Sequence, residues 1–102
     1  MNSVLKEQII RQIAAHATEI NSLVTPKEKV EFIYKALNDI YPKVALTDAA
    51  NNTLKMIEYQ RRLDIEHLLH ALHAYISSGE LFFTNDGVTN EVLKNLKTTF
   101  SI

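Results

Sequence analysis

The sequence predicts an all-α protein, an antiparallel four-helix bundle with a long third helix. Residues 54–78 contain no Gly or Pro and place their apolar residues at helical spacing. The whole chain of 102 residues holds only two Gly and two Pro, which are too few for a turn-rich β-sandwich. This length suits one compact domain. We therefore expect residues 1–102 to form a single helical bundle with short loops.

The first helix is expected over residues 3–21. Ser3 is a suitable N-cap, and Glu7 follows just beyond the first turn, where a negative charge is still favourable. The apolar residues share an arc of roughly 100°, which is typical of an amphipathic core helix. They are Ile9, Ile10, Ile13, Ala17 and Ile20. The polar face lacks the density of Lys and Arg that a helix lying on a membrane requires.

The second helix has the clearest local start signal. In the segment TPKE, Thr25 is placed as N-cap, Pro26 as the first helical residue and Glu28 as the third, which is a capping box. The helix should continue to about residue 41, because Pro42 disfavours a helical residue before it. Its apolar side consists of Val30, Ile33, Tyr34, Leu37, Ile40 and Tyr41.

The third helix is the long one, with Thr47 and Asp48 as candidate caps. Its apolar stripe spans about 120°. The stripe consists of Ile65, Leu68, Leu69, Leu72, Tyr75 and Ile76. Because Arg61 interrupts this side, either the helix bends near Asp64 or the Arg61 side chain extends toward the end of the bundle. One continuous, curved helix is favoured, and Gly79 is expected to end it.

The last helix is expected over residues 89–98, with Thr84 or Thr89 as its cap. Its apolar side consists of Val88, Val92, Leu96 and Phe100. Lys94 and Lys97 lie near its C-terminal end, where the helix dipole favours positive charge.

Three histidines recur at intervals of three residues on the long helix, at His67, His70 and His73. Histidines at such spacing are able to ligate a metal. These three lie opposite the apolar stripe, whereas metal sites of helical bundles are built from side chains in the core. A solvated polar face is therefore favoured, and no metal or cofactor is expected. A metal site and a pH-responsive or partner-binding face stay open as alternatives.

Composition excludes several classes of function. With 11 basic and 12 acidic residues the formal charge is -1, which argues against a nucleic-acid binder. The chain has no Cys, no Gly-rich phosphate loop and no nucleophile elbow, so we expect no enzyme. No apolar run approaches the roughly 18 residues of a membrane span. A cytoplasmic protein without a transmembrane segment is expected.

Three segments resemble the immunity proteins of pediocin-like (class IIa) bacteriocins, of the enterocin A immunity type. LKEQIIRQIAAHATEI is similar to the first amphipathic helix of that family, and TPKEKVEFIYKALNDIYPKV to its second. LLHALHAYISSGELFFTND resembles the long third helix and its turn into the fourth. The chain departs from the family pattern at residues 71–75, where the family is often richer in Asn and Arg, and in its shorter tail.

The resemblance implies an antiparallel four-helix bundle that acts without catalysis. Such a protein protects the producing cell from its own pore-forming peptide, and its partner is the membrane part of a mannose phosphotransferase permease with the bacteriocin bound. The implied contact surface is the last helix and tail, here Lys94, Lys97, Phe100 and Ile102, assigned by position.

The alternative is a small helical protein–protein interaction module, such as a regulatory, anti-toxin or phage adaptor protein. Phe32 points nearly opposite to the apolar side of its helix, so it is a candidate for a contact outside the monomer core. Phe82, Phe83, Phe100 and Ile102 either close one end of the bundle or form a partner surface. The oligomeric state and a peripheral association with the membrane stay open.

Overall fold

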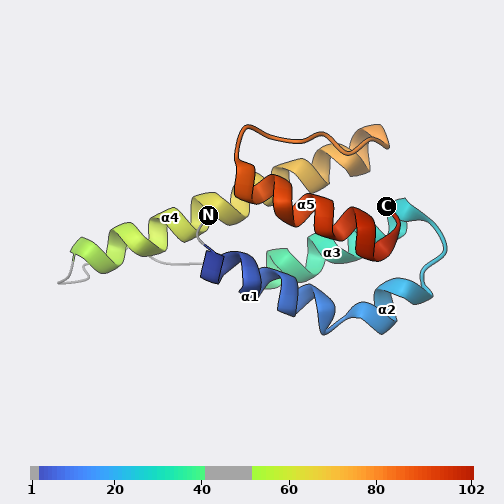
Figure 1. Ribbon diagram of the computed structural model, residues 1–102, viewed down its shortest axis with the longest axis horizontal. Helices are drawn as coiled ribbons and strands as arrows, with labels where there is room; N and C mark the ends of the chain where they lie inside the picture. Colours follow the sequence, from blue (N-terminus) through green and yellow to red (C-terminus); the bar gives the residue numbers. More distant parts are fainter. Residues whose placement is uncertain (1–2, 41–51) are drawn as a thin grey trace.

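The computed structural model describes residues 3–40 and 52–102, which form five α-helices and contain no strand (Figure 1). The helices are α1 (Ser3–Ala14), α2 (Ala17–Ser22), α3 (Pro26–Ile40), α4 (Asn52–Ser78) and α5 (Gly87–Phe100). The all-α prediction is confirmed. The long helix is the fourth of these five elements, because the first predicted helix is divided into two.

Some predictions lie outside the described residues. They are the helix end before Pro42, the caps Thr47 and Asp48, and the side chains of Arg61 and Asp64.

The chain breaks between α1 and α2 at residues 15 and 16. The amide of Ala15 donates to the carbonyl of Arg11 at 2.9 Å, and the amide of His16 donates to the carbonyl of Ile13 at 3.0 Å. The hydrogen bonds thus shorten from four-residue to three-residue spacing, as in a 3₁₀ turn. After this turn α2 packs against α3. The expectation of one helix over residues 3–21 was therefore wrong, and no Gly or Pro marks the break in the sequence.

The predicted N-cap Thr25 starts α3, but the return bond of a capping box, from the Thr25 amide to the Glu28 side chain, is replaced by a bond between the two side chains. The amide of Glu28 donates to Thr25 Oγ1 at 3.2 Å, and this hydroxyl donates to Glu28 Oε1 at 3.1 Å. The carbonyl of Thr25 accepts the amide of Lys29 at 3.1 Å, the first bond of the helix. The side chain of Thr25 therefore satisfies an amide that would otherwise lack a partner at the helix start.

The helix α4 runs without interruption over 27 residues, about 40 Å at the usual helical rise. The prediction of one continuous helix is confirmed. Its N-terminal half extends past the ends of α1 and α5, and its C-terminal half packs against α3 and α5 (Figure 1). Gly79 ends it as predicted, with φ at 79° and its amide donating to the carbonyl of Tyr75 at 2.7 Å.

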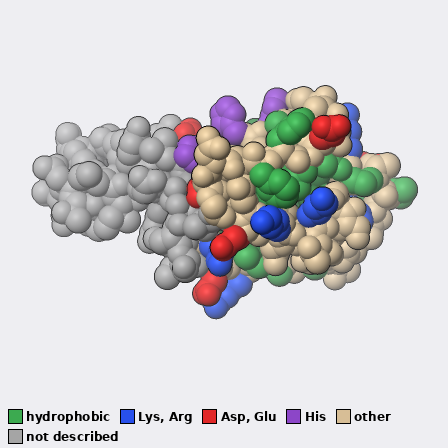
Figure 2. All heavy atoms as spheres, turned by 45° about the horizontal axis from the view of Figure 1, so that its top comes forward, with side chains coloured by type: hydrophobic (Ala, Val, Ile, Leu, Met, Phe, Trp, Pro, Cys, Tyr) green, Lys and Arg blue, Asp and Glu red, His purple; other side chains and the backbone are tan. Residues whose placement is uncertain are grey.

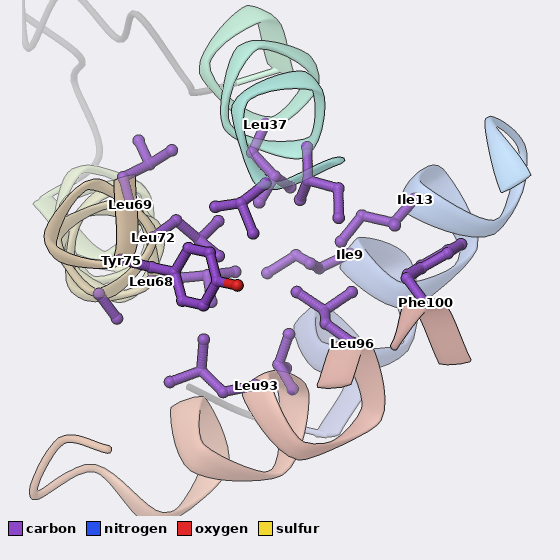
Figure 3. Packing of buried hydrophobic residues seen from close by; sticks show 14 of the residues in the cluster. Ile9, Ile13, Leu37, Leu68, Leu69, Leu72, Tyr75, Leu93, Leu96 and Phe100 are labelled. Atoms are coloured by element: carbon purple, nitrogen blue, oxygen red, sulfur yellow. The ribbon is translucent and has the colours of Figure 1, made fainter. Parts of the chain in front are cut away.

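The predicted apolar stripes meet in one core. Figure 3 shows Leu72 and Tyr75 of α4 pointing toward Ile9 of α1, Leu37 of α3 and Leu93 of α5. The buried hydrophobic residues are Ile9, Ile13, Ile20, Val30, Ile33, Leu37, Ile65, Leu68, Leu69, Ala71, Leu72, Tyr75, Val92, Leu93, Leu96 and Phe100. Leu93 is fully buried although the predicted stripe of the last helix omits it, because α5 packs against both α1 and α4 and buries a wider arc.

Candidate functional site

The candidate site lies on the connection between α4 and α5 and on the adjoining face of α5. We call it the aromatic–lysine surface, and it consists of Phe82, Phe83, Lys94 and Lys97. Phe82 is 53% exposed and Phe83 is 46% exposed. Large apolar side chains that neighbour one another on the surface are an informative exception to burial.

The lysines lie on the side of α5 that faces this connection. The ammonium of Lys94 is 5.9 Å from the centroid of the Phe83 ring, within the range of a cation–π contact. Lys97 and Asn90 lie within about 60° of Lys94 around the helix. Because Asn90 bonds to Thr84 of the connection, all three share that side. Figure 2 shows hydrophobic side chains gathered on this face, with Lys and Arg side chains bordering them.

Asn90 fixes the connection directly after the aromatic pair. The amide of Thr84 donates to Asn90 Oδ1 at 2.7 Å, and Asn90 Nδ2 donates to the carbonyl of Thr84 at 2.8 Å. The side-chain amide therefore bonds both backbone groups of one residue, as a paired strand would. Phe83 immediately precedes the residue that Asn90 holds. Its side chain is therefore exposed on a segment that hydrogen bonds keep in place.

A second set of bonds starts α5 at Asp86. Its carbonyl accepts the amide of Asn90 at 3.0 Å, its Oδ2 accepts the buried hydroxyl of Thr89 at 2.6 Å, and its amide donates to Thr84 Oγ1 at 3.1 Å. Asp86 is therefore the cap of α5. The sequence predicted Thr84 or Thr89 instead. The helix begins at Gly87, two residues before the predicted start.

The structure places the predicted tail residues in or against the core. Phe100 is 2% exposed, four residues after the buried Leu96 and on the same face, and its carbonyl accepts Lys29 Nζ at 3.1 Å. Ile102 is half-buried and packs against the core cluster. The side chain of Phe100 is therefore no part of the exposed surface, which corrects its assignment as a partner contact. The last helix extends to this residue, beyond the predicted end at residue 98.

Phe32 is half-buried and packs against the core, so it is not the isolated exposed aromatic that the helical pattern predicts. Its ring makes an edge contact with the His16 ring, with centroids 5.6 Å apart. His16 lies at the break between α1 and α2. The break therefore places an imidazole against a side chain that a straight helix is not expected to reach.

The three histidines are exposed, as predicted. His67 and His70 line an open hollow of about 250 Å³ together with residues 84–86 of the connection. The ring of His73 lies 6.0 Å from that of Tyr34. Within residues 3–40 and 52–102, no three or more His, Cys, Asp or Glu are grouped so as to hold a metal ion.

The sequence indicated some parts of this site and missed others. The aromatic pair and both lysines are visible in it, but the choice between bundle closure and a partner surface required the fold. Asn90 was missed because an Asn in the first turns of a helix carries no signal of a bond to a residue six positions earlier.

Across the described part of the chain, no helix combines the length and the apolar character needed to cross a bilayer. Comparisons of the chain with protein-family models, with curated proteins and with solved structures found no significant match.

Proposed function

We propose that this protein protects a bacteriocin-producing cell from its own pore-forming peptide, by binding and without catalysis, in the cytoplasm. Its proposed partner is the membrane part of a mannose phosphotransferase permease with the bacteriocin bound. The proposal begins from the three segments that resemble pediocin-like immunity proteins. The all-α fold is the class of fold that the resemblance implies.

The observation that carries the proposal is the aromatic–lysine surface. Its two lysines, Lys94 and Lys97, lie on the last helix, where the resemblance puts the partner contact, and Phe82 and Phe83 lie in the connection before it. Phe82 and Phe83 are each about half exposed, and the bonds between Thr84 and Asn90 hold the segment that carries them. A held, exposed aromatic pair beside a cation is typical of the anchors that dominate protein interfaces.

The proposed arrangement is that of an antiparallel four-helix bundle. In this interpretation α1 and α2 act as one bent arm, which packs with α3 and with α5. The ion pair between Lys6 Nζ and Glu91 Oε2, at 2.9 Å, joins this arm to the last helix.

The test is survival of a bacteriocin-sensitive lactic acid bacterium or streptococcus that expresses the chain. We expect a higher inhibitory concentration for one or a few pediocin-like peptides of a panel. The double variant Phe82→Ser/Phe83→Ser should lose this protection, because it removes the exposed aromatic pair. Val24→Ser is the matched control, since Val24 is 87% exposed in the turn between α2 and α3.

The absence of protection across the whole panel, although the folded protein is present in the cells, would contradict the proposal. Full protection by the Phe82→Ser/Phe83→Ser variant would keep the function and exclude this surface as the contact.

The second candidate function is a helical protein–protein interaction module. The observation that favours it is the hollow lined by His67 and His70, because it offers a concave face beside the aromatic–lysine surface. A pull-down from the native host, compared with a His67→Ala/His70→Ala variant, would identify a partner that depends on this face.

A further inference from the structure

The size of the aromatic–lysine surface limits what it is able to bind. A Phe side chain buries roughly 150–250 Å² when it is fully enclosed. Phe82 at 53% and Phe83 at 46% exposure therefore offer about 100 Å² each. Each partner in a standard protein interface contributes about 800 Å², so a protein partner would also have to contact residues outside the aromatic pair. A lipid surface requires no such area, because side chains that project from the protein enter it individually.

The two lysines beside the aromatic pair are exposed and able to pair with a negatively charged ligand. Within the described residues, neither Lys94 nor Lys97 forms an ion pair with a carboxylate, and both are exposed. Glu91 on the same helix is neutralised by Lys6 at 2.9 Å. Glu80, exposed at the start of the connection, and Asp86, half-buried at its end, add opposing charges. Phenylalanine beside lysine is the composition of membrane-surface segments.

The same charges disfavour a second copy of the chain as the occupant. A two-fold symmetric dimer brings equal patches together. Lys94 and Lys97 of one copy would then approach those of the other, and like charges repel at such an interface.

We propose that the aromatic–lysine surface seats the protein on anionic lipid. Phe82 and Phe83 enter the interfacial layer, and Lys94 and Lys97 pair with lipid phosphate groups. The clamp between Thr84 and Asn90 holds the residue next to the aromatic pair, which lowers the cost of ordering this segment on binding. The inference uses the surface on which the proposed function rests, but purified protein and vesicles test it without reference to cell survival.

The experiment measures co-sedimentation of the purified chain with phosphatidylcholine vesicles that do or do not contain phosphatidylglycerol. We expect binding only to the anionic vesicles, and weaker binding at high salt, because salt screens the lysines. Lys94→Gln/Lys97→Gln should lower the partition constant by about fivefold per lysine removed. Phe82→Ser/Phe83→Ser should lower it roughly tenfold or more.

The matched controls are Lys35→Gln and Val24→Ser, an exposed lysine on α3 and an exposed apolar residue in the turn before it. Both should bind as the wild type does. Thermal unfolding of each variant shows that it is folded. Glu80→Gln should strengthen binding, because it removes one opposing charge.

The inference is overturned if the wild type does not sediment with anionic vesicles, or if both double variants bind as well as it does. Loss of cell protection in the Phe82→Ser/Phe83→Ser variant, without vesicle binding by the wild type, would keep the proposed function and assign the surface to a protein. If the wild type is a dimer in solution and the same variant is a monomer, the surface would be assigned to contact with a second copy of the chain. Vesicle binding without protection would support the inference and reject the proposed function.

Discussion

At the scale of single residues, Asn90 connects the core helix α5 to the exposed aromatic pair. Its side-chain amide donates to one backbone group of Thr84 and accepts from the other. Both bonds are part-buried, so water replaces them poorly when the amide is removed.

We expect Asn90→Ala to lower the free energy of unfolding by about 1–3 kcal/mol, because it leaves both backbone groups of Thr84 without their partner. Urea unfolding measures this. Asn95→Ala is the control, since Asn95 is exposed on the same helix and should change stability by about 0.5 kcal/mol or less. Equal stability of the two variants would show that the clamp contributes nothing.

At the scale of elements, local signals predicted most helix starts and ends, and packing decided the rest. The N-cap at Thr25 and the stop at Gly79 are chemical signals within one turn of chain, so the sequence alone is sufficient to locate them. The break at His16 has no such signal in the sequence, and α2 packs against α3 directly after it. The cap at Asp86 was missed since Thr84, Asn85 and Thr89 are also residue types that favour a cap, and only the fold selects one.

Replacement of the two glycines by alanine should change the stability of the protein in opposite directions. Gly79 has φ at 79° and open space where a Cβ would lie, so Gly79→Ala should cost about 1 kcal/mol through backbone strain alone. Gly87 is the first residue of α5 and also has open space, so Gly87→Ala should stabilise by about 0.4–1 kcal/mol. Thermal unfolding of both variants checks this, and a shift of the same sign in both would contradict the assignment.

At the scale of the whole molecule, periodicity predicted the core more accurately than the surface. In the predicted stripes Leu68, Leu72 and Leu96 are buried as expected. Leu93 was missed, because the width of a buried arc depends on how many neighbours a helix has. Phe32 was predicted to be exposed, because the pattern of its own helix does not show that His16, in the turn between α1 and α2, contacts its ring. The aromatic–lysine surface depends on which residues the core leaves outside, and a single-helix pattern does not contain that information.

Phe100 and Phe82 allow a direct comparison of an aromatic side chain in the core with one on the surface. Phe100→Ala should lower the free energy of unfolding by about 3–5 kcal/mol, because Phe100 is 2% exposed and its removal leaves a cavity. Phe82→Ala should lower it by only about 1–2 kcal/mol, since Phe82 is 53% exposed and loses about half as much buried area. Urea unfolding of both variants measures the difference. Similar losses in the two would mean that the end of α5 is not in the core.

The packing of α5 against α1 has a consequence for how the chain folds. Lys6 and Glu91 bond across 85 positions, and Lys29 bonds to Phe100 across 71. Contacts between such distant positions close large loops, and folding rates fall as contact order rises. During synthesis α1 must therefore wait for α5, which completes the core with Val92, Leu93 and Leu96. We expect the nascent chain to stay exposed to chaperones and proteases until its last helix is made.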